Sequence, residues 1–289
     1  MYDVVIIGGG IAGITAAIYA QRYGMNYVIV SENIGGLLQE ITHVWNYPGS
    51  EGMTGPEFAE LLKKQIESAD IIKDHVIKID EGFKVYLENG MKLKTKTVIL
   101  ATGTHKKHLK LNEHKFLGRG VSYCATCDAP MFTGKDVIVY GGGNAAAHSA
   151  ILLAIYAKTV TVVYHGEKLK MDNTVKKKLK DKNIKIKTKS KITELKGDKF
   201  LEKIVINDKE IKAQGLFVNI GSVPTTEMLN GLKIKHNKQG FIKVNELMET
   251  SVEGVYAAGD VIDKQLRQLV TAASDGGIAS FSAYRFIGK

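Results

Sequence analysis

Short, unbroken runs of apolar residues recur along the chain, and several of them end in glycine or in a small polar residue. Residues 3–7 (DVVII), 27–30 (YVIV), 97–101 (TVILA), 137–140 (VIVY) and 159–163 (TVTVV) are of strand length. Continuous apolar runs of this length are typical of strands that are buried on both faces of a parallel sheet. Helix-like stretches lie between several of them, so the pattern predicts an α/β protein.

The first of these strands leads into a glycine-rich turn, residues 8–13 (GGGIAG), and then into a helix-like stretch. Gly8 permits a tight turn, Gly10 lets the backbone approach a pyrophosphate, and Gly13 lets the helix pack on the strand. The next strand ends close to Glu32, about 20 residues further on, where a ribose hydroxyl needs an acceptor. This order of strand, glycine turn, helix, strand and acid predicts a dinucleotide site.

The same unit occurs a second time. Residues 137–146 (VIVYGGGNAA) echo residues 4–13 (VVIIGGGIAG), and a helix-like stretch and a strand follow again. A chain with two such units is expected to bind two nucleotides in two domains. The candidate contacts in the second unit are Gly141, Gly143, Asn144 and Ala145, with His165 at the place that corresponds to Glu32.

The only two cysteines, Cys124 and Cys127, precede the second unit in a Cys-x-x-Cys arrangement that Asp128 follows directly. Two thiols at this spacing can close a small disulfide ring and reopen it. The thiolate is the reactive form, and a position at a helix start lowers its pKa. So few cysteines in 289 residues argue against a secreted disulfide scaffold, so we expect a cytoplasmic protein whose cysteine pair is catalytic or metal-binding.

Eight motifs, in this order, resemble those of the low-molecular-weight thioredoxin reductase family of flavoprotein disulfide reductases. They are residues 8–13, 46–49 (NYPG), 101–103 (ATG), 124–128 (CATCD), the second glycine turn, residues 221–224 (GSVP), Gly259-Asp260 and Arg267-Gln268. The resemblance covers essentially the whole chain. Residues 118–120 (GRG), before the cysteines, resemble archaeal and anaerobe forms of the family.

The resemblance implies two Rossmann-like dinucleotide-binding domains of the three-layer ββα type, the second inserted in the first. The FAD-binding domain would be discontinuous, with residues 1–112 and 243–289. Residues 113–242 would form a domain of the pyridine-nucleotide type that carries the cysteine pair. The resemblance also favours a homodimer.

The resemblance further implies roles for individual residues. Cys127 would face the flavin and exchange electrons with it, and Cys124 would attack the disulfide of a thioredoxin or a glutaredoxin-like protein through a mixed disulfide. Asp128 would handle the proton as thiol and thiolate interconvert. Besides the first glycine turn and Glu32, the implied FAD contacts are Gly36, Leu37, Asn46, Ala101, Thr102, Gly103, Gly259, Asp260, Arg267 and Gln268.

The electron donor stays open, because the chain departs from NADPH-using members of the family after the second glycine turn. Where those members carry His-Arg-Arg, residues 164–168 read YHGEK and offer no guanidinium for a ribose 2′-phosphate. Lys168 and Lys170 could meet a phosphate as point charges, and His165 is not the acid of a typical NADH site. Related enzymes use ferredoxin or a deazaflavin, and a net charge of +10 would help to steer an acidic ferredoxin.

Composition limits the other classes of function. Apolar runs are too short to span a bilayer, and the lysines lack the aromatic interleaving of a nucleic-acid surface, so we expect neither a membrane nor a nucleic acid as partner. Two alternatives to the enzyme stay open. One is a non-catalytic flavin-binding redox sensor; the other is a zinc site formed by the cysteine pair with His105, His108 or His114.

Overall fold

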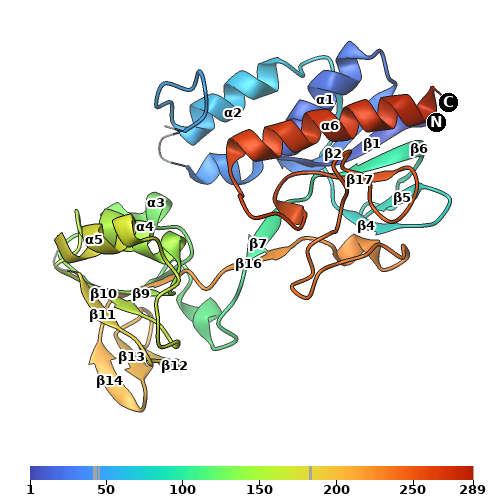
Figure 1. The fold of residues 1–289 in the computed structure, drawn as a ribbon. Helices are drawn as coiled ribbons and strands as arrows, with labels where there is room; N and C mark the ends of the chain where they lie inside the picture. The colour runs from blue at the N-terminus through green and yellow to red at the C-terminus, as the bar shows by residue number, and fades with distance from the viewer. Residues whose placement is uncertain (42–43, 45, 182–183, 289) are drawn as a thin grey trace. The chain divides into compact units, whose positions relative to one another are not determined.

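The computed structural model describes residues 1–41, 44, 46–181 and 184–288. The chain divides into two compact units, and the second is inserted in the first (Figure 1). The first unit comprises Met1–His105 and Val223–Lys289, and the second comprises Lys106–Ser222. The predicted fold class is confirmed. The domain bounds expected from the sequence, between residues 112 and 113 and between residues 242 and 243, lie further along the chain than the bounds of these compact units. The expected bounds stay a prediction.

The first unit is built on a sheet with the strand order β3-β2-β1-β6-β5-β4, in which β17 also pairs with β6. The long strand β6 has neighbours of both kinds: Lys92–Lys94 pair with β5 in antiparallel, and Val98–Leu100 pair with β17 in parallel. The strands are β1 (Tyr2–Gly9), β2 (Tyr27–Ile34), β3 (Asp70–Ile72), β4 (Val76–Ile79), β5 (Lys84–Leu87), β6 (Lys92–Leu100) and β17 (Val255–Ala257).

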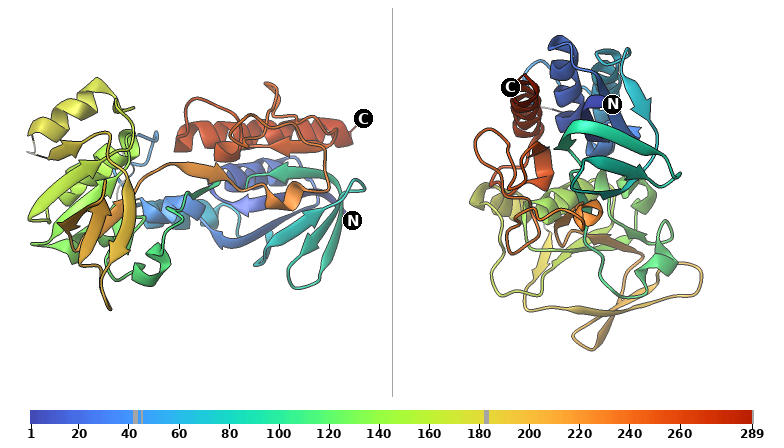
Figure 2. Two further views of the ribbon diagram at one scale, coloured as in Figure 1. Left: turned by 90° about the horizontal axis from the view of Figure 1, so that it is seen from below. Right: turned by 90° about the vertical axis from the view of Figure 1, so that its right-hand side faces the viewer.

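The helices α1 (Ile11–Arg22) and α6 (Leu269–Ile287) run side by side on one side of this sheet (Figures 1 and 2). They approach closely because Gly276 has no side chain: a Cβ there would come 2.1 Å from the carbonyl oxygen of Ala12. The C-terminal helix is thereby fixed to the first turn of α1. The remaining elements are η1 (Gly36–Glu40), α2 (Gly55–Lys64), η4 (Glu227–Leu229) and η5 (Gly259–Val261).

The second unit is built on an all-parallel sheet with the order β11-β10-β9-β15-β8 and a separate antiparallel sheet β12-β13-β14. Its strands are β8 (Val121–Ser122), β9 (Asp136–Tyr140), β10 (Thr159–Val163), β11 (Lys185–Lys187), β12 (Ile192–Lys196), β13 (Lys203–Ile206), β14 (Lys209–Lys212) and β15 (Gly215–Val218). Its helices are η2 (Glu113–Phe116), α3 (Ala125–Asp128), η3 (Ala129–Phe132), α4 (Asn144–Leu153) and α5 (Asn173–Asp181).

The chain passes from one unit to the other twice. Both passages lie in a small two-stranded sheet of β7 (Thr104–Lys106) and β16 (Ser222–Pro224).

The two units share one topology, as the repeated glycine motif predicts. The order β3-β2-β1-β6-β17 in the first unit corresponds to β11-β10-β9-β15-β8 in the second, and both sets of strands are parallel. The last strands of the two orders come from different places in the sequence, because β17 lies near the end of the first unit and β8 is near the start of the second. The glycine turns therefore occupy equivalent places, after β1 and after β9.

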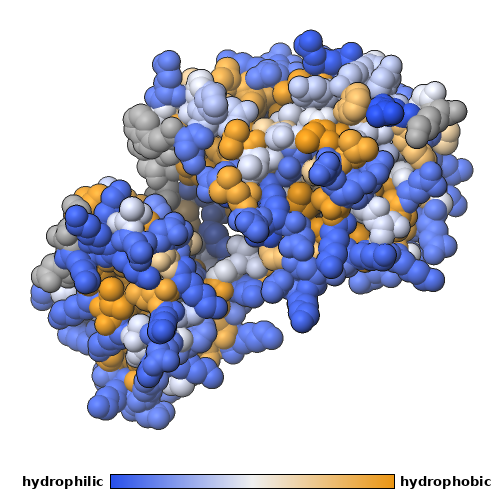
Figure 3. All heavy atoms as spheres, in the orientation of Figure 1, coloured by the Kyte–Doolittle hydropathy of each residue, from blue (hydrophilic) through white to orange (hydrophobic). Residues whose placement is uncertain are grey.

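Charge is divided unequally between the units. The second unit holds 23 lysines and arginines against 11 acidic residues, a net charge of +12, and the first holds 17 against 19, a net charge of −2. Figure 3 shows hydrophilic residues over much of the visible face of the molecule. Among the described helices, none has both the length and the apolar character needed to cross a membrane.

Candidate functional site

The first glycine turn joins β1 to α1 and uses glycine for three different reasons. Gly8 has a φ of +108°, and a Cβ there would come 2.3 Å from the carbonyl oxygen of Ala101. A Cβ on Gly13 would come 1.9 Å from the carbonyl oxygen of Gly8. A Cβ on Gly10 would meet nothing within 4 Å. Gly8 is needed for its backbone conformation and its contact with Ala101, Gly13 is needed for the packing of α1 on the turn, and Gly10 leaves an open surface above the turn.

That open surface lies at the N-terminus of α1, where backbone N–H groups lack partners within the helix. Gly10 is the N-cap residue and provides no side-chain cap, and the first turn of α1 contains no acidic residue. The unpaired N–H groups and the helix dipole therefore favour an anionic group at this place. The pyrophosphate of a dinucleotide has the matching charge.

The predicted contacts Gly36 and Leu37 lie in η1, which is attached to the same turn. The N–H of Gly35 donates to the carbonyl oxygen of Gly9 at 2.7 Å. Gly36 has a φ of +52°, and a Cβ there would come 3.2 Å from the Cα of Gly10. The structure thus brings Gly36 to the glycine turn, and Leu37 beside it is exposed.

Glu32 lies in β2 near the end that meets the turn. The neighbouring Ser31 accepts a hydrogen bond from the N–H of Gly9 at 2.9 Å, which ties this strand end to the turn. The Glu32 carboxylate is exposed and lies 3.6 Å from Nε2 of His75. It is therefore open to a further donor such as a sugar hydroxyl.

The predicted residues that follow β6 also lie against the turn. The N–H of Ala101 donates to the carbonyl oxygen of Ile7 at 2.8 Å. Thr102 Oγ1 donates to the carbonyl oxygen of Thr225 at 2.6 Å, and the N–H of Thr225 donates to the carbonyl oxygen of Gly103 at 3.1 Å. A segment from the far end of the unit thus fixes this strand end.

The structure joins two predicted residues that are far apart in sequence. Asn46 Nδ2 donates to Gln268 Oε1 at 2.9 Å, and Gln268 is the N-cap residue of α6. The adjacent Arg267 donates from Nη2 to the carbonyl oxygen of Ile262 at 3.1 Å, and its guanidinium lies 3.9 Å from the centroid of the Phe241 ring. Both side chains of the Arg267-Gln268 motif are therefore held in place.

Asp260 provides a buried acceptor in η5, directly after β17. Its Oδ1 atom is buried and has no hydrogen-bond partner among the described residues. Burial raises the pKa of this carboxyl, and the positive charges of Lys264 and Arg267 oppose that effect. A buried acceptor without a donor is costly for a protein alone. It fits a ligand that brings a hydroxyl group.

These contacts together suit FAD. The open face of Gly10 and the unpaired N–H groups of α1 match a pyrophosphate, and the carboxylates of Glu32 and Asp260 match hydroxyl donors. The sequence predicted this set, and the structure brings its members to one edge of the sheet in the first unit.

Sequence reasoning missed two charged residues beside Asp260. Lys264 lies within the loop before α6, and Asp275 lies in α6, where it is buried together with Ala272, Gly276 and Ala279. A charged residue within the buried stripe of an alanine-rich helix is the signal that could have identified Asp275. Lys264 stands out from the other lysines only through its surroundings in the fold.

The second glycine turn, between β9 and α4, keeps the close approach of the first. Gly141 has a φ of +158°, and a Cβ there would come 2.1 Å from the carbonyl oxygen of Asn219. Ala146 stands at the place of Gly13. Oδ1 of Asn219 is buried and without a hydrogen-bond partner among the described residues, a second acceptor that sequence reasoning missed.

A segment of the chain lies against this second turn. The N–H of Lys170 donates to the carbonyl oxygen of Gly142 at 2.7 Å. Asn144 Nδ2 donates to Asp172 Oδ2 at 2.7 Å, and the N–H of Asp172 donates back to Asn144 Oδ1 at 2.9 Å. Asn144, a predicted nucleotide contact, is thus already engaged by Asp172. Of the two lysines proposed for a phosphate, the backbone of Lys170 lies at the turn itself.

The other predicted contacts of the second unit lie around this turn. A Cβ on Gly143 would come 3.7 Å from the carbonyl oxygen of Lys170, and Ala145 is exposed in the first turn of α4. His165 is exposed after β10, with its ring centroid 4.7 Å from that of Tyr164. The arrangement leaves exposed groups, but no acid, at the place that corresponds to Glu32.

The cysteine segment forms one short helix, α3. Cys124 is disulfide-bonded, and the chain contains one other cysteine, Cys127, whose side chain lies outside the described part. The N–H of Cys124 donates to Oγ of Ser122 at 3.0 Å, and the N–H of Asp128 donates to the carbonyl oxygen of Cys124 at 3.1 Å. Cys124 thus lies directly before α3, which contains Cys127 and ends in the half-buried Asp128.

A buried carboxylate supports the residue before Cys124. Glu113 is 4% exposed and accepts hydrogen bonds from the N–H groups of Leu109 and Leu111 at 2.8 and 2.9 Å and from the Tyr123 hydroxyl at 3.3 Å. Burial, followed by the charge of Glu113, raises the pKa of Tyr123 to about 12. Tyr123 therefore stays protonated and continues to donate to Glu113.

Within the described part of the chain, no group of three or more histidine, cysteine and acidic residues is placed to hold a metal ion. The disulfide at Cys124 also removes a thiolate that a zinc site would need. The zinc hypothesis gains no support from these residues.

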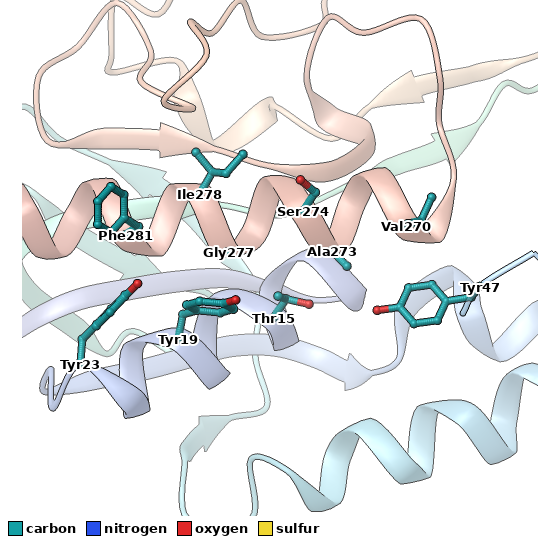
Figure 4. A pocket seen from close by; sticks show the side chains of 10 residues that line it. All are labelled: Thr15, Tyr19, Tyr23, Tyr47, Val270, Ala273, Ser274, Gly277, Ile278 and Phe281. Atoms are coloured by element: carbon teal, nitrogen blue, oxygen red, sulfur yellow. The ribbon is translucent and has the colours of Figure 1, made fainter. Parts of the chain in front are cut away.

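A groove of 590 Å³ in the first unit lies between α1 and α6 (Figure 4). Aromatic rings line it: Tyr19 and Tyr23 from α1, Phe281 from α6, and Tyr47. The rings of Tyr23 and Tyr284 stack with their centroids 4.7 Å apart. Both helices thus present exposed aromatic surface.

Comparison with known proteins gives one family for the whole chain. Residues 2–277 match the family of pyridine nucleotide-disulphide oxidoreductases. The chain is 35% identical to the thioredoxin reductase of Bacillus subtilis, over 99% of this chain and 95% of that protein. It is also 35% identical to a longer protein, the NADH dehydrogenase of the same organism, of whose length it spans 58%.

Solved structures agree with this result. Thioredoxin reductase of Lactococcus lactis matches with a TM-score of 0.92 and 32% identity, over 100% of this chain and 99% of that one. A ferredoxin-flavin thioredoxin reductase of Clostridium acetobutylicum matches with a TM-score of 0.55 and 31% identity, over 99% of this chain and 98% of that one.

Two glycine variants separate the cofactor site from the fold. We expect Gly10→Ala to change the unfolding free energy of the apo-protein by less than about 1 kcal/mol, because its methyl group meets no protein atom. The same methyl group faces the site, so we expect the dissociation constant of FAD to rise at least about tenfold, or about 1.4 kcal/mol. Denaturant unfolding and flavin fluorescence titration measure the two quantities.

Gly13→Ala is the matched comparison. Its methyl group would overlap the carbonyl oxygen of Gly8, so we expect a loss of apo-protein stability of about 1–3 kcal/mol. A Gly10→Ala protein with the affinity of the original chain for FAD would show that the pyrophosphate does not lie over this turn.

Proposed function

We propose that this chain, which belongs to the pyridine nucleotide-disulphide oxidoreductase family, reduces the disulfide of a thioredoxin-like protein through Cys124 and Cys127. It is an FAD-dependent disulfide oxidoreductase of the thioredoxin reductase type. The observation that carries the proposal is the disulfide-bonded Cys124 directly before the one-turn helix α3, which contains Cys127 and ends in Asp128. A thioredoxin or a glutaredoxin-like protein is the expected partner.

In this proposal, FAD supplies a carrier for an electron pair when it is bound, and the first unit binds and orients it. The first glycine turn approaches the pyrophosphate, and Glu32 and Asp260 accept hydrogen bonds from hydroxyl groups. The remaining residues that would contact the cofactor are Gly36, Leu37, Asn46, Ala101, Thr102, Gly103, Gly259, Arg267 and Gln268. Their fixed positions in the first unit support these roles.

The cysteine pair carries the electrons onward by thiol–disulfide exchange. An electron pair and two protons convert the Cys124–Cys127 disulfide into two sulfhydryl groups, one of which then loses its proton to give the Cys124 thiolate. The Cys124 thiolate attacks one sulfur of the partner's disulfide, so a mixed disulfide forms and the other partner sulfur leaves as a thiolate. Cys127 then attacks Cys124, which releases the partner in reduced form and restores the internal disulfide. Asp128 supplies and accepts the proton that accompanies these steps.

Serine variants of the two cysteines test the relay. Because the cysteines act as a unit, we expect Cys124→Ser, Cys127→Ser and the double variant each to lower turnover with a thioredoxin disulfide by at least about 10³-fold, with no further loss in the double variant. The bound FAD content should stay unchanged.

Met131→Ala is the matched control, because Met131 is exposed just beyond the helix. Full turnover of the Cys124→Ser protein with the thioredoxin disulfide would contradict the proposed thiol–disulfide relay. A single turnover without repetition in the unmodified protein would favour the redox sensor instead.

For the electron donor, the second glycine turn supports a pyridine nucleotide, NADPH or NADH. The turn repeats the close backbone approach of the first one, it contains Gly141 and Gly143, and Ala145 follows it in α4. Lys170 lies at the turn and can place a positive charge near a phosphate, and His165 is exposed at the end of β10. Asn144 would contribute through its existing hydrogen bonds to Asp172.

A second candidate donor is an acidic carrier such as ferredoxin, or a deazaflavin. Two observations favour it: the second unit has a net charge of +12, and residues 164–168 contain no arginine. A similar structure is that of a ferredoxin-flavin thioredoxin reductase. A surface with this charge raises the association rate of an acidic protein at low salt.

Anaerobic reduction of the flavin, read as the loss of its absorbance, separates the donors. Offered separately, NADPH or NADH should bleach the flavin, and we expect Lys170→Glu to weaken this reaction at least about tenfold, since it reverses a charge beside a phosphate. Lys158→Glu is the control, because Lys158 is exposed just before β10, at the opposite end of the strands from the glycine turn. Bleaching by reduced ferredoxin alone, with a rate that falls as salt rises, would reject the nucleotide and support the second candidate.

We also propose a homodimer and a cytoplasmic location. The exposed aromatic rings of α1 and α6 form an apolar face on the first unit, and Figure 3 shows hydrophobic residues along α6. A second copy of the chain would cover this face. The location follows from the reducing compartment that so few cysteines indicate.

Light scattering after size-exclusion chromatography tests the dimer. We expect twice the chain mass of 31.6 kDa, and Phe281→Glu should shift the protein to the monomer because it places a charge in the apolar face. Leu117→Glu, at an exposed leucine of the second unit, should leave the mass unchanged. A monomer in the unmodified protein would contradict the proposal.

A further inference from the structure

Lys264 and Asp275 form a buried ion pair next to Asp260. Lys264 Nζ and Asp275 Oδ2 are 2.6 Å apart, and their side chains are only 13% and 12% exposed. Among the ion pairs of the described residues, no other has both partners so deeply buried. A charge pair in such a place loses much of its hydration, so it stabilises a protein weakly at best. Its presence calls for a role besides stability.

Asp275 also holds the backbone of the predicted cofactor site. The same Oδ2 atom accepts a hydrogen bond from the N–H of Gly259 at 3.1 Å. Gly259 precedes Asp260 and has a φ of +81°, and a Cβ there would come 2.9 Å from the Cβ of Ala12. The Asp275 carboxylate thus holds the Gly259–Asp260 turn, and Gly259 lies close to Ala12 at the start of α1.

Lys264 reaches three groups from the loop before α6. Besides Asp275, its Nζ lies 3.4 Å from Oγ1 of Thr271 and 4.0 Å from Oδ1 of Asp260. The Thr271 hydroxyl oxygen accepts a hydrogen bond from the N–H of Gln268 at 3.3 Å, within the cap of α6. One ammonium group therefore connects Asp260 with the helix end that bears Gln268.

The position of Asp275 is set by the packing of α6. The next residue, Gly276, lies against the carbonyl oxygen of Ala12 with no room for a side chain. Ala12 itself belongs to the first glycine turn. The ion pair is therefore fixed to the element that receives the pyrophosphate as well as to the element that carries Asp260.

We propose that Lys264 and Asp275 are positioning residues for FAD: Asp275 holds the Gly259–Asp260 turn against α1, and Lys264 orients the Asp260 carboxylate toward the hydroxyl groups of the cofactor. Neither residue needs to contact FAD. Oδ1 of Asp260 is a buried acceptor, and the Lys264 ammonium lies 4.0 Å from it, where its charge favours one orientation of the carboxyl. Loss of either partner leaves the other as an unpaired buried charge beside the site.

The affinity of the apo-protein for FAD measures this role directly. In a fluorescence titration, we expect Asp275→Asn and Lys264→Met each to raise the dissociation constant of FAD at least about tenfold, the range found when a supporting hydrogen bond beside a bound group is lost. Because the two residues act together, the double variant should lose no more affinity than the worse single variant.

A second measurement separates positioning from stability. Denaturant unfolding of each apo-protein gives its stability, and the titration is compared only at temperatures at which every variant is folded. Asp3→Asn is the matched control, because it breaks the ion pair of Asp3 with Lys96 in the same unit, at 2.8 Å, away from the predicted cofactor contacts. We expect this control to lose some stability and to keep its FAD affinity within about twofold, since the lost pair is partly exposed.

The outcomes are distinct. A rise in the FAD dissociation constant for Asp275→Asn and Lys264→Met, but not for Asp3→Asn, supports the proposal. Unchanged affinity in both variants, or equal losses in all three that follow their stability, overturns it. None of these results depends on the electron donor or on the disulfide partner, so the proposed function stands or falls separately.

Discussion

In each unit, the backbone of a glycine turn lies directly against the backbone that follows the neighbouring strand. In the first unit, a Cβ on Gly8 would come 2.3 Å from the carbonyl oxygen of Ala101, and in the second a Cβ on Gly141 would come 2.1 Å from that of Asn219. This contact brings the N-terminus of a helix to the edge of the sheet where the strands end. Gly36, Ala101 and Gly259 in the first unit, and Asn144 in the second, lie against or next to one of these two turns or the helix that follows it.

The two turns nevertheless differ in what surrounds them. Above Gly10 the surface is open, and a buried acceptor without a donor lies nearby at Asp260. At the second turn, a segment of the chain is hydrogen-bonded to Gly142 and to Asn144. Each unit keeps a buried acceptor without a donor among the described residues, Asp260 Oδ1 in the first and Asn219 Oδ1 in the second, and such an acceptor is costly until a ligand satisfies it. The turns therefore differ in the open space above Gly10 and in the segment bound to the second turn.

The sequence predicted the features that depend on local backbone geometry. The strands, both glycine turns, the repeat and the one-turn cysteine helix follow from residue types at fixed spacing, and the structure contains them. The sequence could not predict side-chain contacts that depend on how elements far apart in the chain pack together. Lys264 and Asp275 meet only because Gly276 sets α6 against Ala12, and Asn46 meets Gln268 across most of the chain. Asp172 engages Asn144 for the same reason, although the motif around Asn144 was visible.

Every step of the proposed reaction requires FAD and the pair Cys124–Cys127 to form a single redox unit. An anaerobic titration with a two-electron reductant, followed by flavin absorbance and by thiol content, tests it most directly. Because FAD and a disulfide each take an electron pair, full reduction of the protein should consume two equivalents of reductant, and the variant with both cysteines changed to serine should consume one. Consumption of a single equivalent by the unmodified protein, with no new thiols at full flavin bleaching, would contradict the claim.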